Sequence, residues 1–181
     1  YSPSQIEKLL HGPAYTLTQP PRWRLDDYKF WLPLLGLYTG ARLSELCQLR
    51  LEDIRQELGV WIISINRTGS KQLKTSDSER LVPIHKQLIE TGFLDYHQAR
   101  LDIVKQDMKA PLFENIRVYG DLSPGHVASR WYLGSSQGSH GYLGLCGLGE
   151  EGLTYHGLRH TFINQFRRQN LDLAKAKALV G

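Results

Sequence analysis

The sequence predicts an α+β fold that is mostly helical and contains a small three-stranded antiparallel sheet. Apolar residues recur at helical spacing over most of the 181 residues. Two runs, 59–67 and 80–85, are instead β-branched or extended in character, and a polar stretch between them is typical of a long hairpin turn. With 41% hydrophobic and 22% charged residues, the composition is that of a globular domain with a sizeable core, which argues against a disordered chain.

Three helical segments are predicted before the sheet. Ser2 fits the N-cap of a short helix that runs toward Leu10. Apolar residues at helical spacing predict a second helix within 26–40, which Pro33 must start or kink. The stretch 41–54 continues with an apolar helical face, and its last four residues are also the possible third strand of the sheet.

More helices are predicted after the sheet. The pattern from Lys86 to about Lys105 is helical and is interrupted at Gly92. Further helical patterns occupy 126–133, 158–166 and 172–180. Between Gly134 and Gly152 there are seven glycines, so this segment is predicted to be a mobile loop.

Charge and cysteine content narrow the class of protein. Lys and Arg exceed Asp and Glu by 22 to 18, which permits a polyanionic partner without demanding one. Cys47 and Cys146 are isolated, so neither a disulfide framework nor a CxxC metal site is indicated, and a reducing, cytoplasmic setting is expected. No apolar run approaches the roughly 18 residues that a membrane helix needs, so no membrane partner is expected.

Two tempting motifs do not have the context that they require. A GxGxxG pattern in 147–152 lacks the βαβ unit of a dinucleotide site and contains two glutamates that would repel a pyrophosphate. His156 and His160 have the spacing of a zinc pair, but the glutamate of HExxH is missing and Arg159 would place a fixed cation beside the metal. We therefore expect neither a cofactor nor a metal.

What remains is a set of cationic side chains from three distant segments. Arg42 lies at a predicted helix start, Lys71 and Lys74 lie in the hairpin turn, and His156 and Arg159 lie on one face of a late helix. Two arginines can hold both non-bridging oxygens of a phosphodiester, a lysine can protonate a leaving oxygen, and a histidine can donate a hydrogen bond or transfer a proton. Taken singly, the arginines and lysines would be interpreted as solvated surface charges and His156 as a satisfied core histidine. The combination indicates phosphate chemistry.

Three motifs carry a family resemblance. TGARLSEL (39–46), the KT of the hairpin followed by RLVPIH, and HGLRHTF (156–162) occur in the order in which the catalytic domain of the tyrosine recombinases, or phage integrases, has its motifs. The chain resembles that domain from about Asp26 onward. The resemblance implies an integrase-type fold and an active site of Arg, Lys, His, Arg, a further His or Trp, and a nucleophilic Tyr.

The resemblance also implies roles for residues of this chain. By matching motif, the catalytic residues are Arg42, Lys74, His156 and Arg159. Lys71 is the rival for the lysine role, because the register of the long turn cannot be read from the sequence. Glu45 is expected to orient Arg42, and His160 is expected to pack beneath the site.

The chain departs from the family pattern at its ends. The motif that precedes the fifth catalytic residue ends here at Gly181, and none of the nine tyrosines matches the position of the nucleophile. We therefore expect residues 1–181 to be a C-terminal catalytic domain truncated before the fifth catalytic residue and the tyrosine, without the N-terminal core-binding domain. Alone, it would bind DNA weakly and not cleave it.

The function implied for the parent protein is site-specific recombination of double-stranded DNA. A tyrosine would form a 3′-phosphotyrosyl link and expel a 5′-hydroxyl, with no need for ATP or metal. The resemblance implies a homotetramer on DNA in a bacterial, phage or mobile-element setting. A non-catalytic DNA-binding or regulatory remnant of an integrase and, less favoured, a type IB topoisomerase remain as alternatives.

Overall fold

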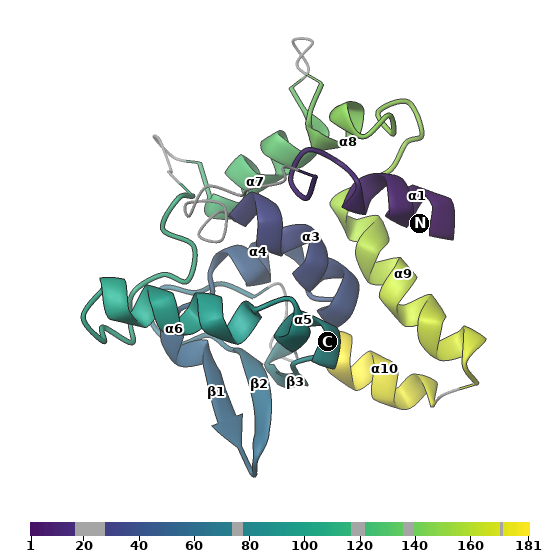
Figure 1. Cartoon of the computed structure of the whole chain (residues 1–181). Helices are drawn as coiled ribbons and strands as arrows, with labels where there is room; N and C mark the ends of the chain where they lie inside the picture. The colour runs from purple at the N-terminus through teal and green to yellow at the C-terminus, as the bar shows by residue number, and fades with distance from the viewer. Residues whose placement is uncertain (17–27, 74–77, 117–121, 136–139, 171) are drawn as a thin grey trace.

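The computed structural model describes residues 1–16, 28–73, 78–116, 122–135, 140–170 and 172–181. The helices are grouped around α3 near the centre, and the small sheet lies at the lower side in this view (Figure 1). The helices in chain order are α1 (Pro3–Leu10), α3 (Tyr28–Thr39), α4 (Leu43–Cys47), the 3₁₀ turn η1 (Leu51–Asp53), α5 (Lys86–Glu90), α6 (Phe93–Ile103), α7 (Pro124–Leu133), α8 (Tyr142–Leu145), α9 (Tyr155–Arg168) and α10 (Leu173–Val180). The strands are β1 (Ile54–Glu57), β2 (Val60–Ile65) and β3 (Arg80–Pro83).

The sheet is the predicted antiparallel meander, in the order β1-β2-β3. Ile63 lies opposite Ile54 of β1 and opposite Val82 of β3, and all three side chains are buried. Because strand side chains alternate between the two faces, this register directs one apolar row into the core. The α+β, mostly helical fold class is confirmed.

The first two helices agree with their predictions in position. Ser2 caps α1 through the amide of Gln5, whose side chain returns a bond to Ser2. The central helix α3 packs against α9 and α4 and buries apolar residues on all sides, Trp31 among them. It begins at Tyr28, so Pro33 does not start the helix but lies inside it.

The stretch 41–54 is not one helix, which corrects the prediction. It divides into the short α4, the turn η1 and the first residue of β1. Instead, the amide of Leu51 donates to the carbonyl of Ala110, and the carbonyl of Leu49 accepts from the amide of Leu112. These main-chain groups are therefore not available for the hydrogen bonds of a longer helix. The third strand consequently lies at Ile54–Glu57 rather than at 51–54.

The predicted break at Gly92 is confirmed. Gly92 has a φ of 93° and is the N-cap of α6, directly after α5. A left-handed backbone is readily adopted only by glycine, so the chain turns there without steric conflict.

The described part of the glycine-rich segment 134–152 is not all loop, which corrects the prediction. It contains α8, and Tyr142, Leu143 and Leu148 are buried. The Tyr142 hydroxyl donates to the carbonyl of Leu9, which ties the segment to α1. The prediction counted the glycines of this segment and gave no weight to the apolar residues between them, which are buried. Residues 136–139 lie outside the described part of the chain.

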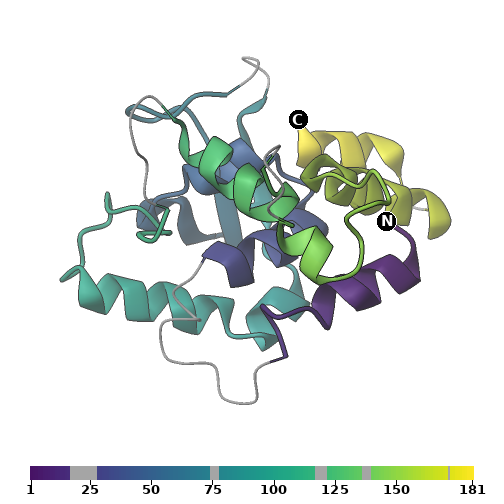
Figure 2. The ribbon, with the colours of Figure 1, turned by 90° about the horizontal axis from the view of Figure 1, so that it is seen from above.

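The last two helices bring distant parts of the chain together. Asp172 caps α10 through the amide of Ala174, and α10 returns along α9 so that its C-terminal end lies beside β3 (Figures 1 and 2). The N-terminal amine of Tyr1 donates to Thr161 of α9. In the part of the chain that the structure describes, no helix has the length and apolar character to cross a membrane.

Candidate functional site

Arg42 and Arg159, predicted from motifs more than a hundred residues apart, meet at the end of α10. Arg42 is the N-cap of α4, and Arg159 lies on the second turn of α9. Both guanidinium groups donate to the carbonyl of Gly181, at 3.4 Å from Arg42 Nη2 and 2.7 Å from Arg159 Nη2. The fold therefore joins the first and last predicted motifs.

Arg159 is buried and is held by main-chain oxygens. Its Nη1 donates to Gly40 at 2.9 Å and to Val180 at 2.5 Å, in addition to the bond from Nη2 to Gly181. Burial, followed by the nearby charges of Arg42 and Arg80, lowers the pKa of Arg159 to about 10. It is still a cation at neutral pH, fixed in orientation by three carbonyls.

Glu45 lies one helical turn after Arg42 and orients it. Its carboxylate accepts the Arg42 amide at 2.9 Å and Arg42 Nη1 at 2.7 Å. Burial alone would raise the pKa of Glu45, but hydrogen bonds from Arg80 and Arg42 hold it below its usual value. The two bonds from Arg42 fix the position of its guanidinium relative to α4.

Arg80 is a member of this cluster that the sequence analysis did not single out. It is the first residue of β3, and its Nη2 donates to Glu45 Oε2 at 2.7 Å. Its Nε donates to the carbonyl of Leu179 and its Nη1 to that of Ser78, both at 2.7 Å. The motif RLVPIH contains this arginine, but nothing in the spacing connects it to Glu45, which lies on another element.

His156 and His160 lie on one face at the start of α9. Both are exposed, and their rings meet edge to face with centroids 4.7 Å apart. His160 is therefore beside His156 at the surface, and does not pack beneath the site as the sequence indicated.

Of the two hairpin lysines, only Lys71 belongs to the residues that the structure describes. Lys71 is almost completely buried, and its Nζ donates to both Asp53 oxygens at 2.7 Å and to Asn66 Oδ1 at 3.0 Å. An ammonium group has three hydrogens, so these three acceptors engage all of them. Lys74 lies outside the described residues.

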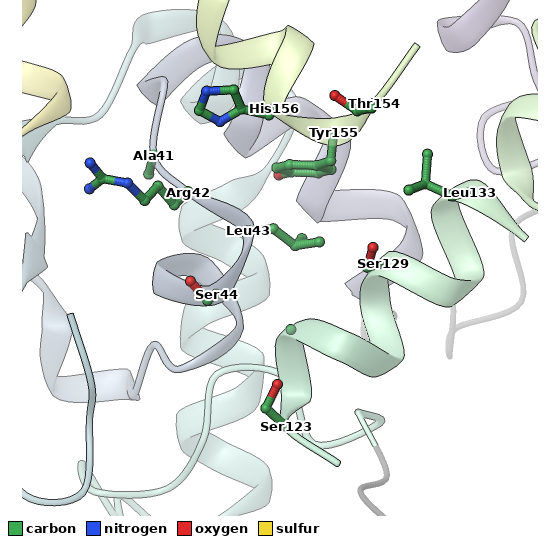
Figure 3. Close-up of a pocket in the computed structure, with 11 residues that line it drawn as sticks. Ala41, Arg42, Leu43, Ser44, Ser123, Ser129, Leu133, Thr154, Tyr155 and His156 are labelled. Atoms are coloured by element: carbon green, nitrogen blue, oxygen red, sulfur yellow. The ribbon is translucent and has the colours of Figure 1, made fainter. Parts of the chain in front are cut away.

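A cavity of about 420 Å³ adjoins this cluster. Arg42 and His156 lie at one side of it, and Ser123, the N-cap of α7, lies at the other with Ser129 and Leu133 of that helix (Figure 3). The described residues that line the cavity include no carboxylate, and most of the polar ones are serine or threonine. A second cavity of about 310 Å³ shares Ser44, Ser123 and Gly125 with the first and extends toward Gln72 after β2.

The hydroxyl groups of the core tyrosines are committed to structure. Those of Tyr15, Tyr96, Tyr142 and Tyr155 each donate to a main-chain carbonyl. Burial raises the pKa of Tyr155, which adjoins His156, well above its ordinary value. This hydroxyl is thus poorly suited to act as a nucleophile. Over the described residues, no group of histidine, cysteine and carboxylate side chains is arranged to hold a metal.

Comparison with known proteins gives one group of relatives. The tyrosine recombinase XerA of Thermococcus onnurineus is 31% identical over 163 residues, which are 90% of this chain and 48% of that protein. The crystal structure of XerA recombinase superposes with a TM-score of 0.66 at 23% identity, over 100% of this chain and 55% of that one. XerH recombinase bound to its difH substrate gives 0.63 at 20% identity, over 100% and 46%.

A more distant structure has the same fold. The lambda integrase tetramer bound to a Holliday junction gives a TM-score of 0.51 at 18% identity, over 99% of this chain and 45% of that one. This chain spans about half the length of the curated relatives that it matches. No family profile matches it.

Proposed function

We propose that this chain, whose sequence and fold are those of a tyrosine recombinase catalytic domain, holds the scissile phosphate in a site-specific DNA recombinase. The observation that carries the proposal is the meeting of Arg42 and Arg159 beside a cavity whose described lining residues include no carboxylate. The relatives are recombinases, and XerH was solved on its DNA substrate. The activity, the DNA partner and the assembly of the whole protein are parts of this proposal.

The charges of the cluster suit a phosphodiester. Arg42, Arg80 and Arg159 contribute three positive charges and Glu45 one negative charge, so the net charge of these four residues is +2. A guanidinium presents a planar fork that matches phosphate oxygens. Preorganised cations of this kind stabilise the additional charge of a pentacoordinate transition state.

The proposed reaction follows from these positions. A tyrosine oxygen attacks the phosphorus, the bond to the 5′-oxygen breaks, and a 3′-phosphotyrosyl link forms; a 5′-hydroxyl of another strand then reverses the step. Arg42 lines the cavity and neutralises the phosphorane directly, while Arg159, whose donors are held by main-chain carbonyls, adds its positive charge from its buried position. His156 at the cavity rim hydrogen-bonds the phosphate or transfers a proton. Neither ATP nor a metal is required, because the covalent link retains the energy of the broken bond.

Lys74 is proposed as the general acid that protonates the leaving 5′-oxygen. The alternative, Lys71, has its three donors engaged by Asp53 and Asn66 and its side chain enclosed. Reaching a leaving group would require Lys71 to abandon a buried ion pair, which is energetically costly. The contacts of Lys71 therefore favour Lys74 for this role.

We infer that the DNA strand runs along the two joined cavities. Their lining of serine and threonine hydroxyls, glycine and glutamine offers hydrogen bonds to phosphate and sugar without like-charge repulsion. Arg42 and His156 line the first of these cavities, so the scissile phosphate is placed beside them. The path requires no contact with base edges.

Residues 1–181 are further proposed to be the catalytic part of a longer protein that assembles as a homotetramer on DNA in the cytoplasm. The length ratio to the relatives and the absence of a matching tyrosine among the nine in the chain support the first point. The lambda integrase tetramer supports the second.

The test begins by sequencing the source gene beyond the codon for Gly181 and expressing the complete gene product. The complete gene product is incubated with a pool of nicked duplexes of varied sequence, and a denaturing gel reports covalent protein–DNA adducts. We expect an adduct that is lost when Arg42 or Arg159 is replaced by Ala, since each would leave phosphorane charge unneutralised.

Other outcomes identify the alternatives. DNA binding without an adduct would favour the non-catalytic remnant. An adduct with relaxation of supercoiled DNA but without strand exchange would favour a type IB topoisomerase. If the complete product binds no duplex even at low salt, the proposal fails.

A further inference from the structure

The position of Arg80 suggests a role that a phosphate-binding arginine does not have. Its side chain is only 5% exposed and its donors reach Glu45 and the carbonyls of Leu179 and Ser78. Arg42, by comparison, is 23% exposed and lines the cavity. Arg80 thus has no path to a ligand in that cavity, whereas Arg42 does.

Glu45 is shared between the two arginines. Oε1 accepts from Arg42 Nη1, and Oε2 accepts from Arg80 Nη2 and from the Arg42 amide. The Glu45 side chain is 1% exposed, so water does little to screen its charge. If Arg42 were its one cationic partner, the pair would be neutral and Arg42 would attract an anion weakly.

We propose that Arg80 is a positioning residue that compensates the charge of Glu45 and so leaves the charge of Arg42 to act on a phosphate. The inference rests on the proposed function, in which Arg42 binds DNA. Glu45 fixes the direction of the Arg42 side chain. Arg80 supplies the positive charge that balances the Glu45 carboxylate, so the charge of Arg42 is not neutralised by it. Through Leu179, the same side chain holds the end of α10, where Arg159 is also bound.

The test compares the affinity of the chain for a fluorescent duplex across variants, at one fixed low salt concentration. Arg80→Met removes both the charge and the hydrogen bonds, and we expect the Kd to rise by about five- to tenfold, a coupling of ordinary size for contacting charges. Arg80→Lys retains the charge, so most of the affinity should remain. The double variant Arg80→Met with Glu45→Gln removes both charges together and should regain most of the loss.

A purely structural role predicts a different pattern. Arg80→Lys would then be as weak as Arg80→Met, because lysine cannot reach the same three acceptors, and the double variant would be weaker still. Either result would overturn the proposal. The double variant also avoids an uncompensated buried carboxylate, so it remains informative if Arg80→Met alone does not fold.

Two further variants complete the experiment. In an Arg42→Ala background, Arg80→Met should change the Kd by less than about twofold, since the effect passes through Arg42; a full additional loss would contradict the proposal.

Arg100→Met is the matched control, because Arg100 is also buried and paired, with Glu114 at 2.6 Å. Arg100→Met should lower the free energy of unfolding but leave the Kd for the duplex unchanged. If its Kd rises as much as that of Arg80→Met, the Arg80 effect is due to lost stability and the proposal is overturned. Failure of the wild-type chain and of Arg42→Ala to differ in DNA binding would instead count against the proposed function.

Discussion

At the scale of single residues, several buried polar side chains are held by specific partners, and their contacts have measurable consequences. Arg159 is the strongest case, because one guanidinium satisfies carbonyls of Gly40, Val180 and Gly181 on two segments. These bonds connect the turn after α3 to the end of α10. The orientation of this arginine is therefore part of the stability of the fold.

Replacing Arg159 by Lys should lower the free energy of unfolding by about 1–3 kcal/mol. Lysine keeps the charge but is a single point donor, so buried carbonyls lose their partners. Urea unfolding followed by circular dichroism measures the change. Arg168→Lys, an exposed position on the same helix, should stay within about 0.5 kcal/mol of the wild type; equal midpoints for both variants would show that the Arg159 bonds contribute nothing.

The pH dependence of stability should contain a contribution from His97. Burial lowers its pKa below 6.5, although its ring nitrogen bonds the carbonyl of Leu51 at 2.9 Å. Above pH 6.5 the histidine is neutral in both states; below it, the unfolded chain takes up a proton that the folded chain resists, so stability falls. The free energy of unfolding between pH 7.5 and about 5.5 should decline less steeply in His97→Gln. An identical slope in the two proteins would assign the decline to other groups.

At the scale of elements, the hairpin between β2 and β3 is fixed to the segment after α4. Lys71 and Asp53 form a buried ion pair, and Gln48 and Gln72 exchange two hydrogen bonds. Gln48 is the C-cap of α4, and Arg42 is its N-cap. One short helix therefore sets the position of the hairpin relative to the first arginine of the site.

Breaking the ion pair from one side should be severe. Lys71→Met leaves the Asp53 charge buried, and the expected loss is about 3–5 kcal/mol of unfolding free energy. Replacing both residues, Lys71→Met with Asp53→Leu, should recover part of that loss because no uncompensated charge remains. Thermal unfolding of the three proteins decides this, and a single variant as stable as the wild type would show that the pair is structurally dispensable.

At the scale of the whole molecule, the net charge of +4 is modest, so affinity for DNA must depend on where the cations lie. The proposed site concentrates three arginines around Glu45 and the end of α10, and one of them, Arg42, lines the adjoining cavity. Binding to such a site releases counterions from the DNA. It should weaken as salt rises.

The salt dependence of duplex binding should report the Arg42 contact directly. A plot of log Kd against log salt concentration should be steep for the wild type, and Arg42→Ala should reduce its slope by about 1, the loss of one phosphate contact. Arg55→Ala, at a residue paired with Glu57 on β1, should leave the slope unchanged. A wild-type affinity indifferent to salt would exclude phosphate-based binding.

Local signals in the sequence were sufficient for many elements. The Ser2 cap, the break at Gly92 and the three-stranded sheet were all predicted, because each depends on neighbours in the chain or on a short period. The motifs that carry the family resemblance were also local, and the relatives confirm that resemblance.

Other features depended on partners distant in sequence. The segment 41–54 is not one helix because Ala110 and Leu112 pair with its backbone, and Tyr142 of α8 bonds Leu9 of α1 although it lies in a glycine-rich segment. Neither partner can be inferred from local composition. The same reason explains why Arg80 was missed and why His160 was misplaced.

By itself the sequence determined which side chains are available for the proposed chemistry, since an arginine's fork and permanent charge come with the residue. Only the tertiary structure decided how those charges are distributed. It buried Glu45 between Arg42 and Arg80, enclosed Lys71 with Asp53, and left Arg42 and His156 at the cavity. Charge interactions depend on distance and burial, and both are set when segments far apart in the chain pack together.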